Sequence, residues 1–212
     1  MQHPLFTAPP VPHHFCGCQI DHRPQFLQSV VSVEQVDTWF SDLTAHLKWQ
    51  QDRIHLFGRE HLIPRLNAWY GDQGTDFAYS GIPLKAEQWT NTLTEIRRLL
   101  EEHLEVQLNS VLANLYRNGL DKMGWHSDDE KQMCPKSPIV SVNFGASRKM
   151  QFKPKDQTNT ERLSLLLGHG DLVVMYPPTQ EVTKHCIPMM RKVVEPRINL
   201  TFRRHYIDSS KS

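Results

Sequence analysis

"RINLTFRR", the stretch from Arg197 to Arg204, decides how the fold is interpreted. Side chains in a β-strand alternate between its two faces, so Ile198, Leu200 and Phe202 share one face. The opposite face carries only polar side chains, which are Arg197, Asn199, Thr201 and Arg203. An exposed edge strand would show the same alternation. If the polar face instead points into a barrel, its guanidinium groups require carboxylates or phosphates as partners, which predicts a site for a small anion.

A second segment has the same character and leads to a candidate metal site. In "LANLY", Asn114 and Tyr116 share one face of a predicted strand. Shortly afterwards, "WHSD" places His126 and Asp128 two residues apart. In an extended segment such residues point to the same side, whereas in a helix they point about 200° apart. The nearby Gly124 disfavours a helix, so the pair can converge on one ion.

A third ligand is offered by His185, which lies in the short segment "TQEVTKHCIP". Two histidines and one carboxylate leave coordination positions open, as in non-haem Fe(II) oxygenases. A hydrolytic zinc site uses similar ligands, so both metals remain possible on the ligands alone. The polar-faced strand with its arginines favours the oxygenase, because a hydrolase has no evident need for Arg203 behind the metal.

The flanking sequence predicts helices first and strands afterwards. Ser32 and Gln35 form a capping box in front of one amphipathic helix, and a second helix is predicted between Ala86 and Leu104. Short apolar runs separated by Gly, Pro and Asn follow at 110–117, 139–145, 148–153, 161–167, 171–176 and 197–204. The order predicts an α+β fold, with the N-terminal helices packed on one sheet of a jelly roll.

Four stretches together resemble the AlkB family of Fe(II)- and 2-oxoglutarate-dependent dioxygenases. They are "NLYRNG", "WHSDDE", "SVNFGASRKMQF" and "RINLTFR", which occur in the family's order, and the resemblance extends from about Arg53 to the last strand. Members of this family remove alkyl groups from nucleic acids and are built on a double-stranded β-helix. The resemblance therefore implies that fold for a single domain.

The resemblance also implies a ligand set. His126, Asp128 and His185 would bind Fe(II), and O2 would be a second cosubstrate beside 2-oxoglutarate. Arg203 would bind the carboxylate of 2-oxoglutarate that lies far from the metal. The oxoacid end and the metal surroundings would be shaped by Asn114, Tyr116, Arg197 and Asn199. Thr183 departs from the family pattern, which has Trp two residues before the distal histidine, so the packing behind His185 must differ.

Two further stretches, "HLFGREHLIPRLNAWYGD" and "FAYSGIPL", are similar to the DNA-probing hairpin and base-pocket lid of the duplex-acting members. By this resemblance Phe57 and Gly58 would form a wedge that fills the gap left by a flipped base. Glu130 would contact the exocyclic amine of that base. The remaining implied substrate contacts are Phe77, Tyr79, Ser80 and Trp125. Core packing is the alternative interpretation for Phe57 and Tyr79.

The implied activity is oxidative removal of methyl groups from bases such as 1-methyladenine and 3-methylcytosine in DNA, with release of formaldehyde, succinate and CO2. The same chemistry on RNA, protein or lipid is one alternative. Another is a non-catalytic jelly roll that binds anions or nucleic acid. We expect no membrane attachment, because no stretch approaches the roughly 18 apolar residues of a membrane span. We also expect a monomer that acts inside the cell, in a bacterial cytoplasm or a eukaryotic nucleus.

Charge and composition set further expectations. The net charge is only +1, but Arg148–Lys155 holds four cations and no anion, and Lys184–Arg204 holds six cations against one glutamate. Such patches bind phosphates or form solvated strand faces. We expect a poorly ordered leader at 1–25, one domain at 26–208 with a nucleotide-recognition lid around 53–85, and a tail at 209–212. In the leader, Cys16 and Cys18 are either zinc ligands with nearby histidines or solvated thiols.

Overall fold

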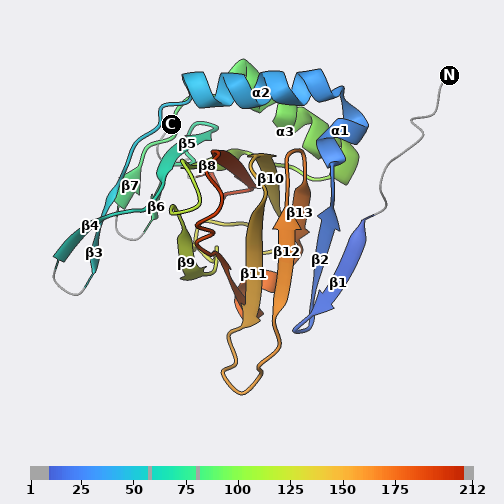
Figure 1. The fold of residues 1–212 in the computed structure, drawn as a ribbon, viewed down its shortest axis with the longest axis vertical. Coiled ribbons are helices and arrows are strands. Elements are labelled where there is room, and N and C mark those ends of the chain that lie inside the picture. Colours follow the sequence, from blue (N-terminus) through green and yellow to red (C-terminus); the bar gives the residue numbers. More distant parts are fainter. Residues whose placement is uncertain (1–9, 57–58, 80–81, 208–212) are drawn as a thin grey trace.

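Two antiparallel β-sheets face each other at the centre of the computed structural model, which describes residues 10–56, 59–79 and 82–207 (Figure 1). The larger sheet has the order β1 (Val11–Phe15), β2 (Cys18–Arg23), β13 (Leu172–Met175), β10 (Ile139–Gly145), β15 (Arg197–Arg203), β8 (Ser110–Tyr116), β5 (Leu66–Gly71). The smaller sheet has the order β12 (Leu163–Leu167), β11 (Arg148–Pro154), β14 (Thr183–Ile187), β9 (Met123–His126). This arrangement confirms the predicted α+β fold built on a double-stranded β-helix.

Two long helices cover the outer face of the larger sheet (Figure 1). In α2 (Val33–His46) the Ser32 hydroxyl accepts a hydrogen bond from the Gln35 amide at 3.2 Å, as the capping box predicts. The second helix, α3 (Asn91–Leu104), begins later than predicted, because Thr90 caps it and Trp89 precedes it. Short helices α1 (Phe26–Val30) and α4 (Thr179–Val182) flank the sheets. Among the described helices, none is long and apolar enough to cross a membrane.

The two faces of the larger sheet pack against different parts of the protein. Its outer face packs Val111, Val142 and Phe202 against Trp39 of α2 and Ile96 of α3, all of them buried. Burial of so much apolar surface supplies the main driving force for folding. The inner face meets the smaller sheet across a second apolar cluster and a polar region. The alternation within each strand separates these two environments.

The expectation of a poorly ordered leader is wrong for residues 11–23. Strands β1 and β2 form a hairpin, and β2 pairs with β13 in the larger sheet. Phe15, Cys18 and Ile20 are buried, but Val11 is exposed and Asp21 is buried, so apolar and polar residues do not alternate in a way that reveals a strand from sequence. The Cys18 thiol donates to the carbonyl of Phe15. In the described part of the chain, the two leader cysteines do not belong to any metal-binding group.

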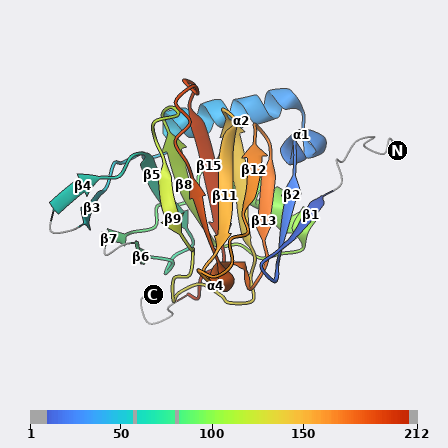
Figure 2. The ribbon, with the colours of Figure 1, turned by 60° about the horizontal axis from the view of Figure 1, so that its bottom comes forward.

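Two small hairpins, β3 (Arg53–Leu56) with β4 (Arg59–Leu62) and β6 (Phe77–Tyr79) with β7 (Ile82–Leu84), extend beside the β5 edge of the larger sheet (Figures 1 and 2). Where the β3–β4 hairpin joins the rest of the domain, the amide of Ile63 donates to the carbonyl of Asp52 at 2.9 Å. The range 53–85, where a nucleotide-recognition lid is expected, contains these two hairpins and also β5 of the larger sheet. Phe57, Gly58 and Ser80 lie outside the described residues.

Arg148, predicted to belong to a phosphate-binding patch, is instead fully buried at the start of β11. Its guanidinium donates to the backbone carbonyls of Asn118, Asp121 and Pro188 at 2.8–3.0 Å. Burial lowers its pKa. Arg148 thus links two loops to the smaller sheet through hydrogen bonds. The expectation that this residue binds phosphate at the surface is wrong.

We expect Arg148→Met to lower the free energy of unfolding by about 3 kcal/mol, because three buried carbonyls lose a charged donor. Urea unfolding of the full chain measures this loss. Lys149→Met, at the exposed neighbouring position, serves as the matched control and should change stability by less than about 0.5 kcal/mol. Equal effects of the two variants would contradict the proposed structural role of Arg148.

Candidate metal centre

Three potential metal ligands meet between the two sheets. His126 ends β9 and His185 lies in β14, and these two residues face each other in the pairing of the strands. Asp128 follows two residues after His126. Its carboxylate oxygens lie 3.6 Å from Nε2 of His126 and 3.7 Å from Nε2 of His185. One ligand atom from each residue lies within 4.8 Å of the others, so a single cation fits among them.

Neighbouring groups fix the orientation of these ligands. The Nδ1 atom of His126 hydrogen-bonds the carbonyl of Gly124 at 2.8 Å, which leaves Nε2 directed at the carboxylate. The backbone amide of Asp128 donates to Oε1 of Gln180 in α4 at 2.9 Å. Ser127 donates to the carbonyl of Thr183 at 2.7 Å. The ligand loop is therefore held against α4 and β14 before any ion binds.

Thr183 occupies the position where the family pattern has Trp, and it is fully buried. Its hydroxyl donates to the carbonyl of Thr179 at 2.7 Å. The ring behind His185 is that of Phe152, with centroids 5.8 Å apart. The packing behind the distal histidine is thus supplied by β11, while Thr183 joins α4 to β14.

The charges at the centre suit a divalent cation. Burial raises the pKa of Asp128, but Arg203 and the two imidazoles outweigh it and lower this pKa to about 2. Burial, together with His126, lowers the pKa of His185 to about 3. The centre therefore offers an ionised carboxylate and a neutral imidazole at neutral pH. These are the protonation states that metal binding requires.

The polar face of β15 points inward, as the barrel interpretation predicts. β15 lies between β10 and β8 within the larger sheet, so the edge-strand alternative is wrong. The register places Asn199 opposite Asn114 on one side and opposite Asn143 on the other. The cavity next to the triad is lined by polar side chains from these strands, namely Asn114, Tyr116, Ser141, Asn199, Thr201 and Arg203.

Arg203 lies beside the triad, close to the candidate metal ligand Asp128. Its guanidinium is 3.0 Å from the Asp128 carboxylate and 3.1 Å from that of Glu130. The sequence reveals that two arginines share the inner face, but not which end of the strand faces the metal. Glu130 is expected to contact the nucleobase of the substrate. In this structure its carboxylate accepts a hydrogen bond from the guanidinium of Arg203.

Arg197 lies on the same face of β15 as Arg203 but at the other end of the strand. The two residues are about 20 Å apart along the backbone at the usual rise per residue. Arg197 is fully buried and donates to the Asn143 side chain. Its Nε and Nη1 atoms have no hydrogen-bond partner among the described residues. Burial lowers its pKa to about 10, although the neighbouring Tyr116, whose ring centroid is 5.1 Å away, raises it. A buried cation with two unused donors is suited to an anion.

The resemblance also implies substrate contacts by Trp125, Phe77 and Tyr79. Trp125, which is 39% exposed, lies against the ammonium of Lys153 at 4.8 Å and does not line the cavity that His126 borders. Phe77 and Tyr79 belong to β6 in the second small hairpin.

Sequence reasoning missed three residues, two near the triad and one beside Arg197. The Nε atom of buried Arg65 donates to Oδ1 of Asn114 at 2.8 Å, and no pattern in the sequence marks this arginine. Gln180, which holds Asp128, carries no signal either. Asn143 could have been found, because "VSVNFG" alternates polar and apolar residues in the manner of the last strand.

A jelly roll that holds two histidines and an aspartate between its sheets has the ligand set of a non-haem Fe(II) oxygenase centre. The family model for the 2OG-Fe(II) oxygenase superfamily matches residues 22–203. "DNA oxidative demethylase ALKBH2" of Mus musculus is 39% identical over 158 residues, which cover 72% of this chain and 66% of that protein. "Alpha-ketoglutarate-dependent dioxygenase alkB homolog 3" of Bos taurus is 36% identical over 188 residues, covering 84% and 64%.

A solved structure, "The structure of OsALKBH1", superimposes with a TM-score of 0.58 at 14% identity over 88% of this chain and 96% of that one, which supports the fold alone. The chain belongs to the 2OG-Fe(II) oxygenase superfamily and, within it, to the AlkB family. It spans about two thirds of the length of the two curated relatives. The His-Asp-His group fits the Fe(II) that gives this superfamily its name.

Proposed function

We propose that the protein is an Fe(II)- and 2-oxoglutarate-dependent dioxygenase that removes methyl groups from N-methylated bases in DNA. The observation that carries this proposal is the convergence of His126, Asp128 and His185 in a cavity that Arg203 of β15 also lines. The relative from Mus musculus is named a DNA oxidative demethylase, which supports DNA as the substrate. With DNA as the substrate, the proposed compartment is a bacterial cytoplasm or a eukaryotic nucleus.

In this proposal His126, His185 and the carboxylate of Asp128 would hold the iron. When bound, Fe(II) supplies the oxidation of the methyl group with O2 and 2-oxoglutarate, which is converted to succinate and CO2. The hydroxylated methyl group then leaves the base nitrogen as formaldehyde. The protein contributes the placement of the substrates and the exclusion of water around them.

Arg197 is the residue that we assign to the distal carboxylate of 2-oxoglutarate. Its two unused donors and the absence of a carboxylate partner among the described residues support this role. Arg203 remains beside Asp128 and the oxoacid end, near the metal. The two arginines thus exchange the places expected from sequence. Tyr116, Asn114 and Asn199 line the wall along which the dicarboxylate lies.

The base is held, in this proposal, near the carboxylate of Glu130. A methylated adenine or cytosine carries a positive charge, which a carboxylate and aromatic faces stabilise. The methyl group sits on an edge that the duplex hides, so the nucleotide must be flipped out at a cost of a few kcal/mol. Phe57 and Gly58, with Phe77, Tyr79 and Ser80, stay the proposed contacts for this step.

A basic groove of about 320 Å³ lies beside the β11–β12 loop and is proposed to hold backbone phosphates. Four cations line it with one aspartate, namely Lys153, Lys155, Arg162, Lys184 and Asp156. Trp125 lies next to Lys153 and offers a ring for stacking. These cations would add affinity without reading sequence, because phosphates are the same at every position.

The double variant Lys153→Gln/Lys184→Gln is expected to weaken DNA binding about tenfold at moderate salt. The slope of log affinity against log salt should fall by about 2, because two phosphate contacts are lost. Fluorescence anisotropy with a labelled oligonucleotide measures both quantities. Lys48→Gln, an exposed lysine paired with Glu87 on the helix side, is the control and should retain the full slope. An unchanged slope in the double variant would refute this use of the groove.

Anaerobic reconstitution tests the proposed function as a whole. The protein is loaded with Fe(II) and 2-oxoglutarate, mixed with a methylated oligonucleotide and exposed to air. We expect formaldehyde and succinate in equal amounts, for DNA containing 1-methyladenine or 3-methylcytosine. Parallel reactions contain methylated RNA and a methylated protein. If only the protein substrate releases formaldehyde, the proposed substrate class is wrong, and release without 2-oxoglutarate would refute the oxygenase.

A further inference from the structure

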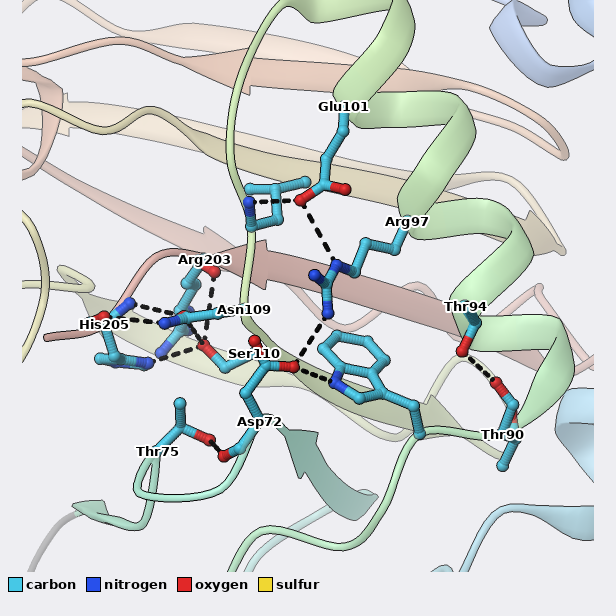
Figure 3. Close-up of polar contacts among 12 residues, drawn as sticks. Asp72, Thr75, Thr90, Thr94, Arg97, Glu101, Asn109, Ser110, Arg203 and His205 are labelled. Atoms are coloured by element: carbon cyan, nitrogen blue, oxygen red, sulfur yellow. Dashed lines mark hydrogen bonds and ion pairs between the residues drawn. The ribbon is translucent and has the colours of Figure 1, made fainter. Parts of the chain in front are cut away.

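Three segments meet behind Arg203, outside the metal centre itself: the end of β15, the start of β8, and residues 130–134. Figure 3 shows Asn109, Ser110, Arg203 and His205 joined by hydrogen bonds at this point. The carbonyl of Arg203 accepts from the amide of Asn109 at 2.9 Å. The main chain that carries the guanidinium is therefore tied directly to β8.

His205 is held by several hydrogen bonds, although it lies beyond the end of β15. Its Nδ1 atom hydrogen-bonds the Ser110 hydroxyl at 2.7 Å. Asn109 holds the same residue twice, because its side chain accepts from the His205 amide and donates to the His205 carbonyl, both at 2.8 Å. The imidazole is buried, with an edge-to-face contact to Trp69 at 5.3 Å.

The segment that carries Glu130 is attached to the same residue. Met133 pairs with His205 as an isolated bridge. On either side, the amide of Cys134 donates to the carbonyl of Arg204 at 2.9 Å, and the amide of Tyr206 donates to that of Gln132 at 2.8 Å. Glu130 lies three residues before this bridge and contacts Arg203 through its own carboxylate. His205 therefore connects both members of the Arg203–Glu130 pair.

The burial and charge of His205 suit such a role. Burial, and then the neighbouring Arg203, lower its pKa to about 4. The imidazole is thus neutral at physiological pH and adds no second cation beside the guanidinium. A neutral ring with a hydrogen bond and an aromatic neighbour holds one rotamer, because each contact restricts it.

We infer that Ser110 and His205 are positioning residues, which hold the Glu130 segment and Arg203 in the geometry that receives the methylated base. This inference deepens the proposed function, since it assigns control of base recognition at the same site to a segment beyond the last strand. We assign neither residue a direct contact with the substrate or the metal. Their effect passes through the 130–134 segment and the guanidinium.

The test compares Ser110→Ala and His205→Leu with His205→Asn, whose amide replaces the Nδ1 hydrogen-bonding group. We expect the first two to raise KM for a methylated oligonucleotide about tenfold, since small misplacements are costly. Affinity for Mn(II), measured by calorimetry, should stay within about threefold, and kcat should change less than KM. His205→Asn should restore most of the lost KM. Hydrogen exchange of the Cys134 amide should accelerate in Ser110→Ala and His205→Leu.

Tyr70→Phe is the matched control, because it removes one buried hydroxyl hydrogen bond, to the amide of Lys48, on the other face of the same sheet. It should lower thermal stability comparably and leave KM and the Cys134 exchange rate unchanged. The inference is overturned if Cys134 exchange is unaltered in Ser110→Ala, or if KM rises equally in Tyr70→Phe. Wild-type turnover decides the proposed function separately, since the exchange experiment needs no activity.

Discussion

Asp128→Ala is expected to abolish turnover, a loss on the order of a thousandfold or more, because it removes the charged member of the metal-ligand set. The carboxylate lies 3.6 and 3.7 Å from the two Nε2 atoms, and it is the anion that those imidazoles and Arg203 surround. Without it, two imidazoles and a nearby guanidinium would face the cation with no anionic ligand among them. Metal affinity should fall with activity, since the same residue governs both.

The neighbouring aspartate provides the control for this prediction. Asp129 is exposed and pairs with Lys155 at 3.0 Å, so Asp129→Ala changes the same formal charge one residue away. Calorimetric titration with Mn(II) and a formaldehyde assay are the measurements. Asp129→Ala should retain near-stoichiometric metal binding and most of the activity. Should Asp128→Ala still bind metal like the wild type, the ion must sit elsewhere.

Arg197→Met is expected to raise KM for 2-oxoglutarate about a hundredfold or more, while metal affinity stays nearly unchanged. Two charged hydrogen bonds to a carboxylate, each contributing about 1.5–3 kcal/mol, account for a change of this size. Steady-state kinetics with varied 2-oxoglutarate measures it. A variant with unchanged KM would show that the distal carboxylate binds somewhere else.

Arg197→Met should not lower the free energy of unfolding of the protein when cosubstrate is absent. The lowered pKa of Arg197 means that burial disfavours its charged form, by roughly 3 kcal/mol at neutral pH. Replacing an unpaired buried charge with an apolar side chain is therefore expected to leave the stability of the cosubstrate-free protein equal or higher. Arg148→Met provides the contrast, because it should lose stability and keep its KM for 2-oxoglutarate. Urea unfolding of both variants measures the difference.

The sequence predicted the parts of the site that depend on strand alternation and short spacing. The inward polar face of β15 follows from the period of two in "RINLTFRR". His126 and Asp128 converge because an extended segment places alternate residues on one side. His185 joins them because β14 pairs with β9, an arrangement that the spacing alone does not determine.

Other features depend on tertiary contacts that no local pattern encodes. Arg197 and Arg203 share one face, and only the position of the triad decides which arginine lies near the metal. The β1–β2 hairpin was missed because its stability comes from pairing with β13 rather than from its own composition. The run of cations predicts a surface patch that includes Arg148, but this side chain is buried and donates to carbonyls of two loops that are distant in the sequence.

The most direct measurement is a crystal structure of the protein with Mn(II) and 2-oxoglutarate, prepared without O2 and mapped by the anomalous scattering of the metal. We expect one anomalous peak within bonding distance of Nε2 of His126, Nε2 of His185 and the carboxylate of Asp128. The distal carboxylate of 2-oxoglutarate should lie on the guanidinium of Arg197. A peak at any other group, or a dicarboxylate whose far end lies on Arg203, would contradict this account.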